Sequence, residues 1–254
     1  MMKQTQTNRW EELIGPGITA IVGAGGKTTV LSKLVEYGRL AGQPMMVTTT
    51  TRLYESQVAG WNPVYGTDFA AAEEACAKAV HNGRCAAWFQ GVEGTKVVAL
   101  DTKQIDDMLL LHPNWQIVVE ADGAQEKWLK APKISEPVIP RLTTTTIGVL
   151  NLQALGMAID KEYIHNMDLV IDLMERPEGA IITPGMLARL VMHPHGLFQY
   201  GQGERILFCT GYDSVNHRII DGLLDNLSHA NIQQIFLADG YKASCEIRRI
   251  IKWQ

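Results

Sequence analysis

One short segment, ITAIVGAGGKTT at residues 18–29, constrains this chain more than any other. It opens with an apolar, β-branched run that predicts a short buried strand, and it continues into a glycine turn and the start of a helical pattern. Strand, glycine turn, Lys-Thr and helix follow in the order that a phosphate-binding loop requires. Glycines let successive backbone N–H groups converge on phosphate oxygens, and a helix start adds unpaired amides and positive dipole. We therefore favour phosphate binding over a plain strand-to-helix turn.

This loop supplies the first candidate site residues. Lys27 offers a mobile ammonium for the phosphates, and Thr28 offers a hydroxyl suited to Mg²⁺. The usual pattern G-x-x-x-x-G-K-[ST] would place its first glycine at position 21, which is Ile21 here. The shortened G-x-G-G-K-T-T form is similar to the loops of Mur ligases and of some metallochaperone-like NTPases. The residues expected to bind the nucleotide here are Gly23, Ala24, Gly25, Gly26, Lys27, Thr28 and Thr29.

Composition and charge narrow the class of protein. The chain has 254 residues, of which 46% are hydrophobic, so it can bury the core of one large domain. The formal net charge is −4 and the basic residues are dispersed, which gives no reason to expect nucleic acid as a partner. The four cysteines are scattered without a C-x-x-C pair, as is typical of a reducing compartment. Neither a signal-peptide core nor an apolar run of about 18 residues is present, so we expect a cytoplasmic protein without a membrane partner.

Strand and helix patterns alternate along the whole chain. This alternation predicts a three-layer α/β/α, P-loop NTPase-like fold with a mainly parallel sheet, built as one domain over residues 1–254 with residues 1–15 as a leading segment. After the first strand, strands are expected at 45–47, 85–89, 96–100, 116–119, 143–149, 206–209 and 235–238. Helices are expected over 68–82, 102–111 and 214–229, from Pro184 onward, as short stretches at 161–166 and 168–175, and after Gly240.

A second concentration of chemistry is the sequence EADG, which follows the apolar strand at 116–119. If strand geometry persists, Glu120 and Asp122 share one face where the strand ends. A carboxylate at the end of a strand beside the phosphate-loop strand holds Mg²⁺, directly or through water, in P-loop NTPases. The alternative is a turn in which Gly123 supplies a positive φ. We expect Thr28, Glu120 and Asp122 to be the metal-binding residues.

Two further segments are candidates for contact with a nucleotide. Thr48–Arg52 ends a strand with four hydroxyls and a guanidinium, and strand ends line the ligand crevice of an open α/β sheet. Thr49 and Thr50 are therefore candidates for sensing the terminal phosphate, although threonine is also a good strand residue. The sequence TGYD at 210–213 retains only the aspartate of the N-K-x-D pattern, so Asp213 is a base-binding candidate without predicted guanine specificity.

Several motifs together resemble one protein family. They are VGAGGKTT (22–29), TTTTR (48–52), VEADGAQEKWLKAP (119–132), EPVIP (136–140), IGVLNLQALGMAI (147–159) and ITPGML with the following HPHG (182–196). In this order they resemble the YqeC family, the accessory proteins of selenium-dependent molybdenum hydroxylases. The resemblance implies a P-loop NTPase-like fold. It also implies a supporting role in the maturation of molybdenum hydroxylases that carry a labile selenium centre, with such a hydroxylase or its cofactor as partner.

These observations predict a protein that binds ATP or another nucleoside triphosphate with Mg²⁺. Lys27, Thr49 and Asp122 are the candidate catalytic residues, and no residue stands out as a general base, which favours slow or partner-stimulated hydrolysis. Two alternatives remain open. The Mur-like loop is also compatible with an ATP-dependent ligase or transferase, and the same pocket is compatible with a non-catalytic binder of a phosphorylated cofactor such as a molybdopterin nucleotide.

Overall fold

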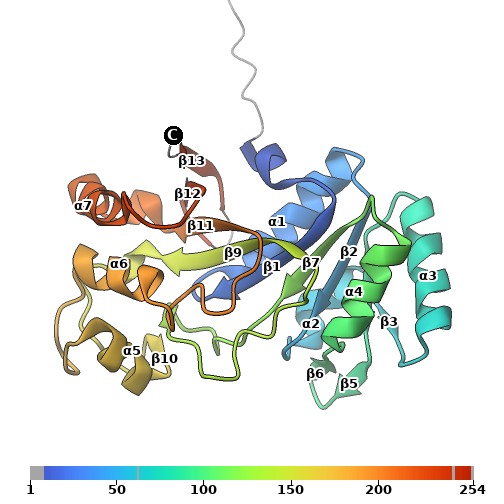
Figure 1. Cartoon of the computed structure of the whole chain (residues 1–254), viewed down its shortest axis with the longest axis horizontal. Coiled ribbons are helices and arrows are strands. Elements are labelled where there is room, and N and C mark those ends of the chain that lie inside the picture. Colours follow the sequence, from blue (N-terminus) through green and yellow to red (C-terminus); the bar gives the residue numbers. More distant parts are fainter. Residues whose placement is uncertain (1–8, 62, 242–243, 253–254) are drawn as a thin grey trace, which may run out of the picture.

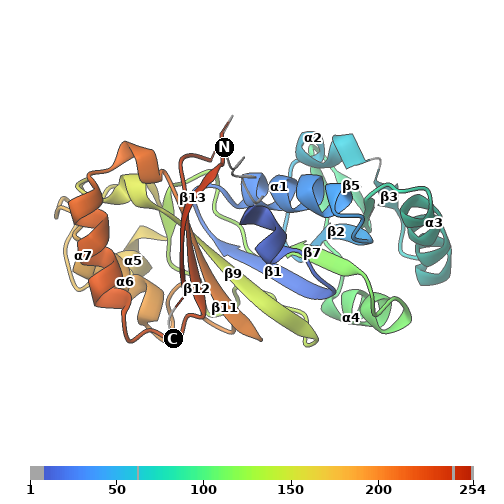
Figure 2. The same cartoon turned by 90° about the horizontal axis from the view of Figure 1, so that it is seen from above.

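A computed structural model describes residues 9–61, 63–241 and 244–252, and its main feature is a nine-stranded sheet with helices on both faces (Figures 1 and 2). The strands of this sheet are β1 (Gly17–Gly23), β2 (Met45–Thr49), β3 (Val64–Tyr65), β4 (Ala86–Phe89), β7 (Gln116–Glu120), β9 (Thr143–Asn151), β11 (Glu204–Thr210), β12 (Gln234–Ala238) and β13 (Ile247–Lys252). Their spatial order is β13-β12-β11-β9-β1-β7-β2-β4-β3.

The remaining elements surround this sheet. Two small sheets pair β5 (Gly91–Glu93) with β6 (Lys96–Val98), and β8 (Leu129–Lys130) with β10 (Ile164–His165). The α-helices are α1 (Lys27–Leu40), α2 (Glu55–Val58), α3 (Phe69–His81), α4 (Thr102–Leu111), α5 (Met167–Met174), α6 (Pro184–Met192) and α7 (His217–Leu227). The 3₁₀ helices are η1 (Arg9–Leu13), η2 (Ala59–Trp61), η3 (Leu152–Ala154) and η4 (Tyr212–Ser214).

The sheet is parallel throughout its described strands, apart from the antiparallel pair of β12 and β13. This confirms the expected α/β class with a mainly parallel sheet. The strand β1 lies between β7 and β9, and Ile21 of β1 is in register with Glu120 of β7. Because the strands are parallel, the residues after β1, β2 and β7 emerge at one edge of the sheet, where such folds bind ligands.

Alternation along β1 explains the three layers. Ala20 and Val22 point to a core shared with α5, α6 and α7, whereas Ile21 points to the opposite face and packs with α1 and with Trp10 of η1. Figure 2 shows α1 on one side of the sheet, across from α4. All seven residues of β1 are buried, so the strand that leads into the glycine turn is fixed from both faces.

Most helices begin as the sequence predicts. Asp68 accepts from the amide of Ala71 at the start of α3, and Thr183 accepts from the amide of Met186 at the start of α6, where Pro184 is the first residue. These side chains satisfy amides that would otherwise be unpaired at the helix N-terminus. The helix α1 is different, because its N-cap residue is Gly26 and no side chain caps it.

Two expectations about local structure are wrong. The segment after Gly240 was expected to be helical, but Ile247–Lys252 forms β13 along the edge of β12. Its β-branched isoleucines pack against the edge, and Arg248 forms an ion pair with Asp239 instead of lying on a helix face. The stretch 161–166 was also expected to be helical, but Ile164–His165 forms β10 beside β8. Tertiary pairing overrides local propensity in both places.

Candidate functional site

The glycine turn after β1 has a backbone that only glycine adopts easily. Gly23, Gly25 and Gly26 have positive φ values of 97°, 75° and 137°. The turn is also packed closely from outside. A Cβ at Gly26 would lie 2.8 Å from Cβ of Tyr241 and 3.0 Å from Cγ2 of Thr210. The glycines are therefore needed both for the turn and for its contacts with segments far along the chain.

The turn leaves several backbone amides without a protein acceptor. Gly23 donates to Asp122 Oδ2 at 3.0 Å, and Ala24 donates to the carbonyl of Val149 at 3.1 Å. No described side chain or loop carbonyl accepts from the next three amides, those of Gly25, Gly26 and Lys27. Unpaired amides at a helix N-terminus form a site for an anion, because the helix dipole adds positive potential there.

The side chain of Lys27 is buried against this turn and is 5% exposed. Its Nζ donates to the carbonyl of Gly23 at 2.7 Å, and it lies 3.2 Å from Asp122 Oδ1 and 3.8 Å from Glu120 Oε1. Burial by itself lowers the pKa of Lys27, but the two carboxylates outweigh burial and raise the pKa above its ordinary value. Lys27 is therefore a charged ammonium that is held at the turn by the carbonyl of Gly23.

A second buried lysine, which the sequence did not single out, supports Asp122. Nζ of Lys130 lies 2.9 Å from Asp122 Oδ2 and 3.0 Å from Glu136 Oε2, and it donates to the carbonyl of Gly123 at 2.7 Å. Lys130 is 2% exposed. The available sequence signal was its place eight residues after Asp122 in the segment VEADGAQEKWLKAP. Nothing in that spacing shows that the chain folds back onto the carboxylate.

The pair Thr28 and Glu120 is the part of the site that suits a magnesium ion. Thr28 Oγ1 donates to Glu120 Oε2 at 3.4 Å, and both residues line the same pocket. Burial raises the pKa of Glu120 above its ordinary value, and the charge of Lys27 opposes this shift. Among the described residues no group of three His, Cys, Asp or Glu is arranged to hold a metal ion alone. A hydroxyl and one carboxylate fit Mg²⁺ that takes its other ligands from phosphates and water.

Three other predicted residues, Asp122, Thr49 and Asp213, are not among the residues that line the pocket. Both oxygens of Asp122 face Lys27, Lys130 or the amide of Gly23, so this carboxylate positions the two lysines and the glycine turn. Thr49 is fully buried, and its hydroxyl donates to the carbonyl of Glu120 at 2.8 Å. Asp213 forms an ion pair with Arg248 at 3.0 Å and is not among the residues that line the pocket.

Gly25, Gly26 and Thr29 of the loop also line the pocket, whereas Gly23 and Ala24 are not among its lining residues. The hydroxyl of Thr29 donates to the carbonyl of Tyr241. Thr50, the second threonine expected to sense a phosphate, instead donates its hydroxyl to the carbonyl of Val138 at 2.6 Å. The neighbouring residues Thr51 and Arg52 do line the pocket. The strand end thus contributes to the site, but through residues one or two positions later than expected.

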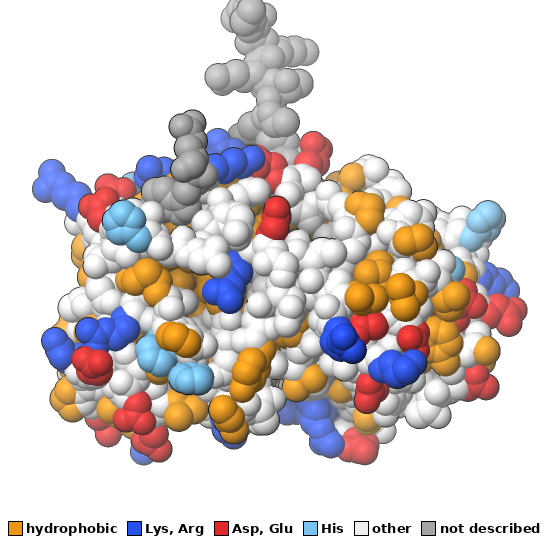
Figure 3. Space-filling model, viewed as in Figure 1, with side chains coloured by type: hydrophobic (Ala, Val, Ile, Leu, Met, Phe, Trp, Pro, Cys, Tyr) orange, Lys and Arg blue, Asp and Glu red, His pale blue; other side chains and the backbone are white. Residues whose placement is uncertain are grey.

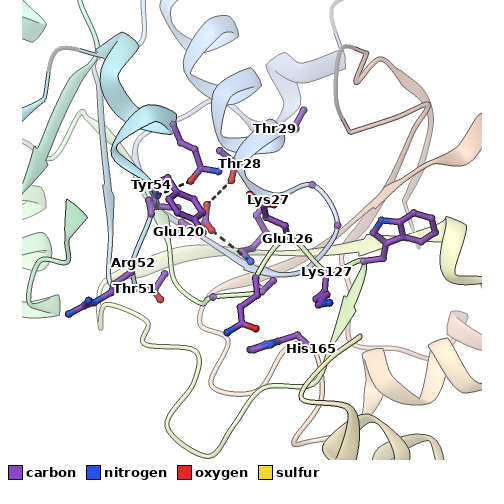
Figure 4. Close-up of a pocket in the computed structure, with 18 of the residues that line it drawn as sticks. Lys27, Thr28, Thr29, Thr51, Arg52, Tyr54, Glu120, Glu126, Lys127 and His165 are labelled. Atoms are coloured by element: carbon purple, nitrogen blue, oxygen red, sulfur yellow. Dashed lines mark hydrogen bonds and ion pairs between the residues drawn. The ribbon is translucent and has the colours of Figure 1, made fainter. Parts of the chain in front are cut away.

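These groups surround one open pocket of about 890 Å³ (Figure 4). The loop residues Gly25–Thr29 form one part of its wall, and Glu120 lies beside Thr28 and Lys27. Among the described residues, the lining includes five Lys or Arg side chains and three Glu side chains, in a chain whose formal net charge is −4. The lining residues that were not among the predicted site residues include Tyr54, Gln57, Lys96, Gln125, Glu126, Lys127, Trp128, Lys133, Glu136, His165 and Tyr241.

A family model and a curated protein match this chain. A family model described as YqeC protein matches residues 19–168. An Escherichia coli (strain K12) protein described as "Uncharacterized protein YqeC" is 28% identical over 239 residues, which cover 93% of this chain and 92% of the relative. A solved structure described as FlhF complexed with GTP/Mg(2+) is 13% identical, with a TM-score of 0.42, over 94% of this chain and 72% of that one. None of the described helices has both the length and the apolar character to cross a bilayer.

Proposed function

The chain belongs to the YqeC protein family, and from this premise we propose that it binds a nucleoside triphosphate together with Mg²⁺ at the N-terminus of α1. The observation that carries the proposal is the arrangement around Lys27. One pocket, at the edge of the sheet where the parallel strands end, brings together three groups. They are three backbone amides without an acceptor among the described residues, the buried ammonium of Lys27, and the pair Thr28 and Glu120. Each group contributes to the binding of a polyphosphate and its metal ion.

Binding of phosphate requires Lys27 to exchange one set of partners for another. In the structure its ammonium is held by the carbonyl of Gly23 and by Asp122. When it turns to phosphate oxygens, Asp122 still has the charge of Lys130 and the amide of Gly23. The carboxylate is therefore not left unpaired, and this lowers the cost of moving Lys27.

Thr28 and Glu120 are the residues that would hold Mg²⁺, directly or through water. The ion, when bound, would neutralise charge on the phosphate oxygens. We propose that hydrolysis is slow or depends on a partner. Glu120 would be engaged by Thr28 and the ion, and Asp122 keeps Lys130 and the amide of Gly23 when Lys27 turns to the phosphates, so neither carboxylate is free to accept a proton from an attacking water.

A titration with the full chain tests the proposal. ATP and GTP, each with Mg²⁺, are titrated calorimetrically into the wild type, into Lys27→Ala and into the control Lys103→Ala, whose side chain is 80% exposed on α4. Loss of one charge-assisted contact predicts an affinity weaker by about 10- to 100-fold for Lys27→Ala and no change for the control. Absence of binding by the wild type, or equal binding by Lys27→Ala, would reject the proposal.

The finer role is proposed on the resemblance of the motifs. We propose a cytoplasmic accessory protein that assists the maturation of selenium-dependent molybdenum hydroxylases, organised as one P-loop NTPase-like domain. The continuity of the sheet from β3 to β13 supports the single domain. Co-purification of a tagged chain with a molybdenum hydroxylase, compared with and without ATP and Mg²⁺, tests the role. Failure to retain the hydroxylase in both conditions would count against it without affecting nucleotide binding.

A further inference from the structure

The pocket extends well beyond the residues that a polyphosphate needs. Its volume of about 890 Å³ lies at the upper end of the range of about 300–1,000 Å³ that small-molecule sites occupy. The phosphate-binding amides belong to only one segment, residues 25–29. Other parts of the wall come from the segment after β2, from β6, from the excursion at residues 123–136 and from β10. The nucleoside of a bound triphosphate can fill part of this space, so a second ligand has to be indicated by the charged groups and donors along the wall.

Outside the glycine loop and β7, the wall carries more basic than acidic side chains. Arg52, Lys96, Lys127 and Lys133 line it, together with the carboxylates of Glu126 and Glu136. Three have protein partners that leave part of their hydrogen-bonding capacity free. Arg52 pairs with Glu93, Lys96 lies 4.8 Å from the ring centre of Tyr54, and Lys127 donates to the carbonyl of Glu162. The ammonium of Lys133 forms no hydrogen bond or ion pair with the described residues.

His165 adds a neutral group to the same region. The pairing of β10 with β8 brings it into register with Lys130, so a residue far along the chain reaches the pocket wall. Burial and the nearby charge of Lys130 lower the pKa of His165, so its imidazole is neutral at physiological pH. No described group forms a hydrogen bond with this ring. In the view of Figure 4, His165 and Lys127 lie on the side of the pocket away from Thr29.

We propose that this second part of the pocket, around Lys133, His165 and Lys127, binds a small molecule that carries an oxyanion, either a carboxylate or a phosphate group, beside the nucleotide. The proposal rests on the proposed function in so far as both ligands share one pocket. The cations and the imidazole supply hydrogen-bond donors for an oxyanion. A small ligand fits better than a nucleic acid, since charged side chains of both signs are intermixed over the face shown in Figure 3.

The experiment separates the two ligands by filling the loop first. The full chain is saturated with Mg²⁺ and AMP-PCP, a non-hydrolysable ATP analogue, and inorganic phosphate or succinate is then titrated into the complex. The double variant Lys133→Ala/His165→Ala is compared with the wild type and with Lys103→Ala/His229→Ala, in which both substituted side chains are exposed. Thermal unfolding of each variant shows that the fold is intact.

We expect at least one of the two anions to bind the saturated wild type and the control variant. The double variant should bind that anion at least about tenfold more weakly, while its affinity for AMP-PCP changes less than twofold. Binding of phosphate alone would indicate a phosphorylated ligand, and binding of succinate alone a carboxylate ligand. The inference is overturned if neither anion binds, or if the double variant binds as the wild type does.

Failure of nucleotide binding would be recognised separately. The same titrations are run without AMP-PCP, where an anion can occupy either the loop or the second region. Suppose that the wild type does not bind AMP-PCP, and that the double variant binds the anion more weakly than the wild type does. The proposed function then fails and the oxyanion site remains. If AMP-PCP binds and the anion affinities of wild type and double variant agree, the oxyanion site fails and nucleotide binding remains.

Discussion

The ammonium of Lys130 lies 2.9 Å from Oδ2 of Asp122, while Lys27 lies 3.2 Å from Oδ1 of the same carboxylate. All three side chains are at most 5% exposed. Asp122 is therefore shared between a lysine in the phosphate-binding loop and a lysine in the excursion that follows β7. This relationship fixes the relative position of two motifs separated by about a hundred residues, and it makes Lys130 a part of the site's support.

Removal of Lys130 should destabilise the fold. Lys130→Met leaves Glu136 without its lysine and removes one of the two cations at the buried Asp122, so we expect the free energy of unfolding to fall by about 3–5 kcal/mol. Urea unfolding measures this difference. The control Lys103→Met changes an exposed side chain and should unfold at the same urea concentration as the wild type. A loss below about 1 kcal/mol for Lys130→Met would contradict the supporting role.

Gly26 should not tolerate a side chain. Gly26→Ala adds a Cβ at a φ of 137°, 2.8 Å from Cβ of Tyr241, so we expect a cost of about 1–3 kcal/mol from the backbone alone. Affinity for nucleotide should fall as well, because the turn must shift to relieve the contact. Thermal unfolding and calorimetry measure the two effects. Gly60→Ala is the matched control, since a Cβ there meets nothing within 4 Å; equal behaviour of both variants would show that the turn is not constrained as described.

The protonation of Glu120 should make stability depend on pH. Burial raises the pKa of Glu120 in the folded state, so the folded chain retains this proton where the unfolded chain has lost it. The stability that Glu120 contributes is fully present below the pKa of a glutamate in the unfolded chain, about 4.3. It is lost as the pH rises through the higher pKa of Glu120 in the folded chain. The difference in unfolding free energy between wild type and Glu120→Gln should therefore decline from about pH 4 upward. Urea unfolding across this range tests the sign, and a rising difference would contradict it.

The four cysteines should be unreactive in the folded chain. All four are buried, and burial raises the pKa of Cys76, Cys85 and Cys245 to about 12 and also raises that of Cys209. A thiol reacts as its thiolate, so a disulfide reagent at about pH 8 should modify no native thiol within minutes. The same reagent should modify all four in guanidinium chloride. Rapid modification of any of them without denaturant would show that the packing around that residue is wrong.

Local patterns predicted much of this architecture, because buried strands and capped helices have signatures that extend over only a few residues. The strand β1, the helix α4 over Thr102–Leu111 and the cap Thr183 all lie where the sequence indicated. The edge strand β13 was missed, since its isoleucines and arginines fit a helix equally well until β12 provides a partner. Thr49 and Asp213 could not be placed either, because hydrogen bonds to distant groups decide where their side chains point.

The sequence by itself determined the glycine turn, the lysine that follows it, and the carboxylates of Glu120 at the end of β7 and of Asp122 just after it, since each depends on neighbours in the chain. Only the tertiary structure decided that Lys130 pairs with Asp122, that Asp122 faces lysines and not the pocket, and that His165 reaches the pocket wall. These contacts depend on how the excursion after β7 folds back and on the pairing of β8 with β10. Such long-range contacts are set by packing and burial of charge, which no local spacing of residues records.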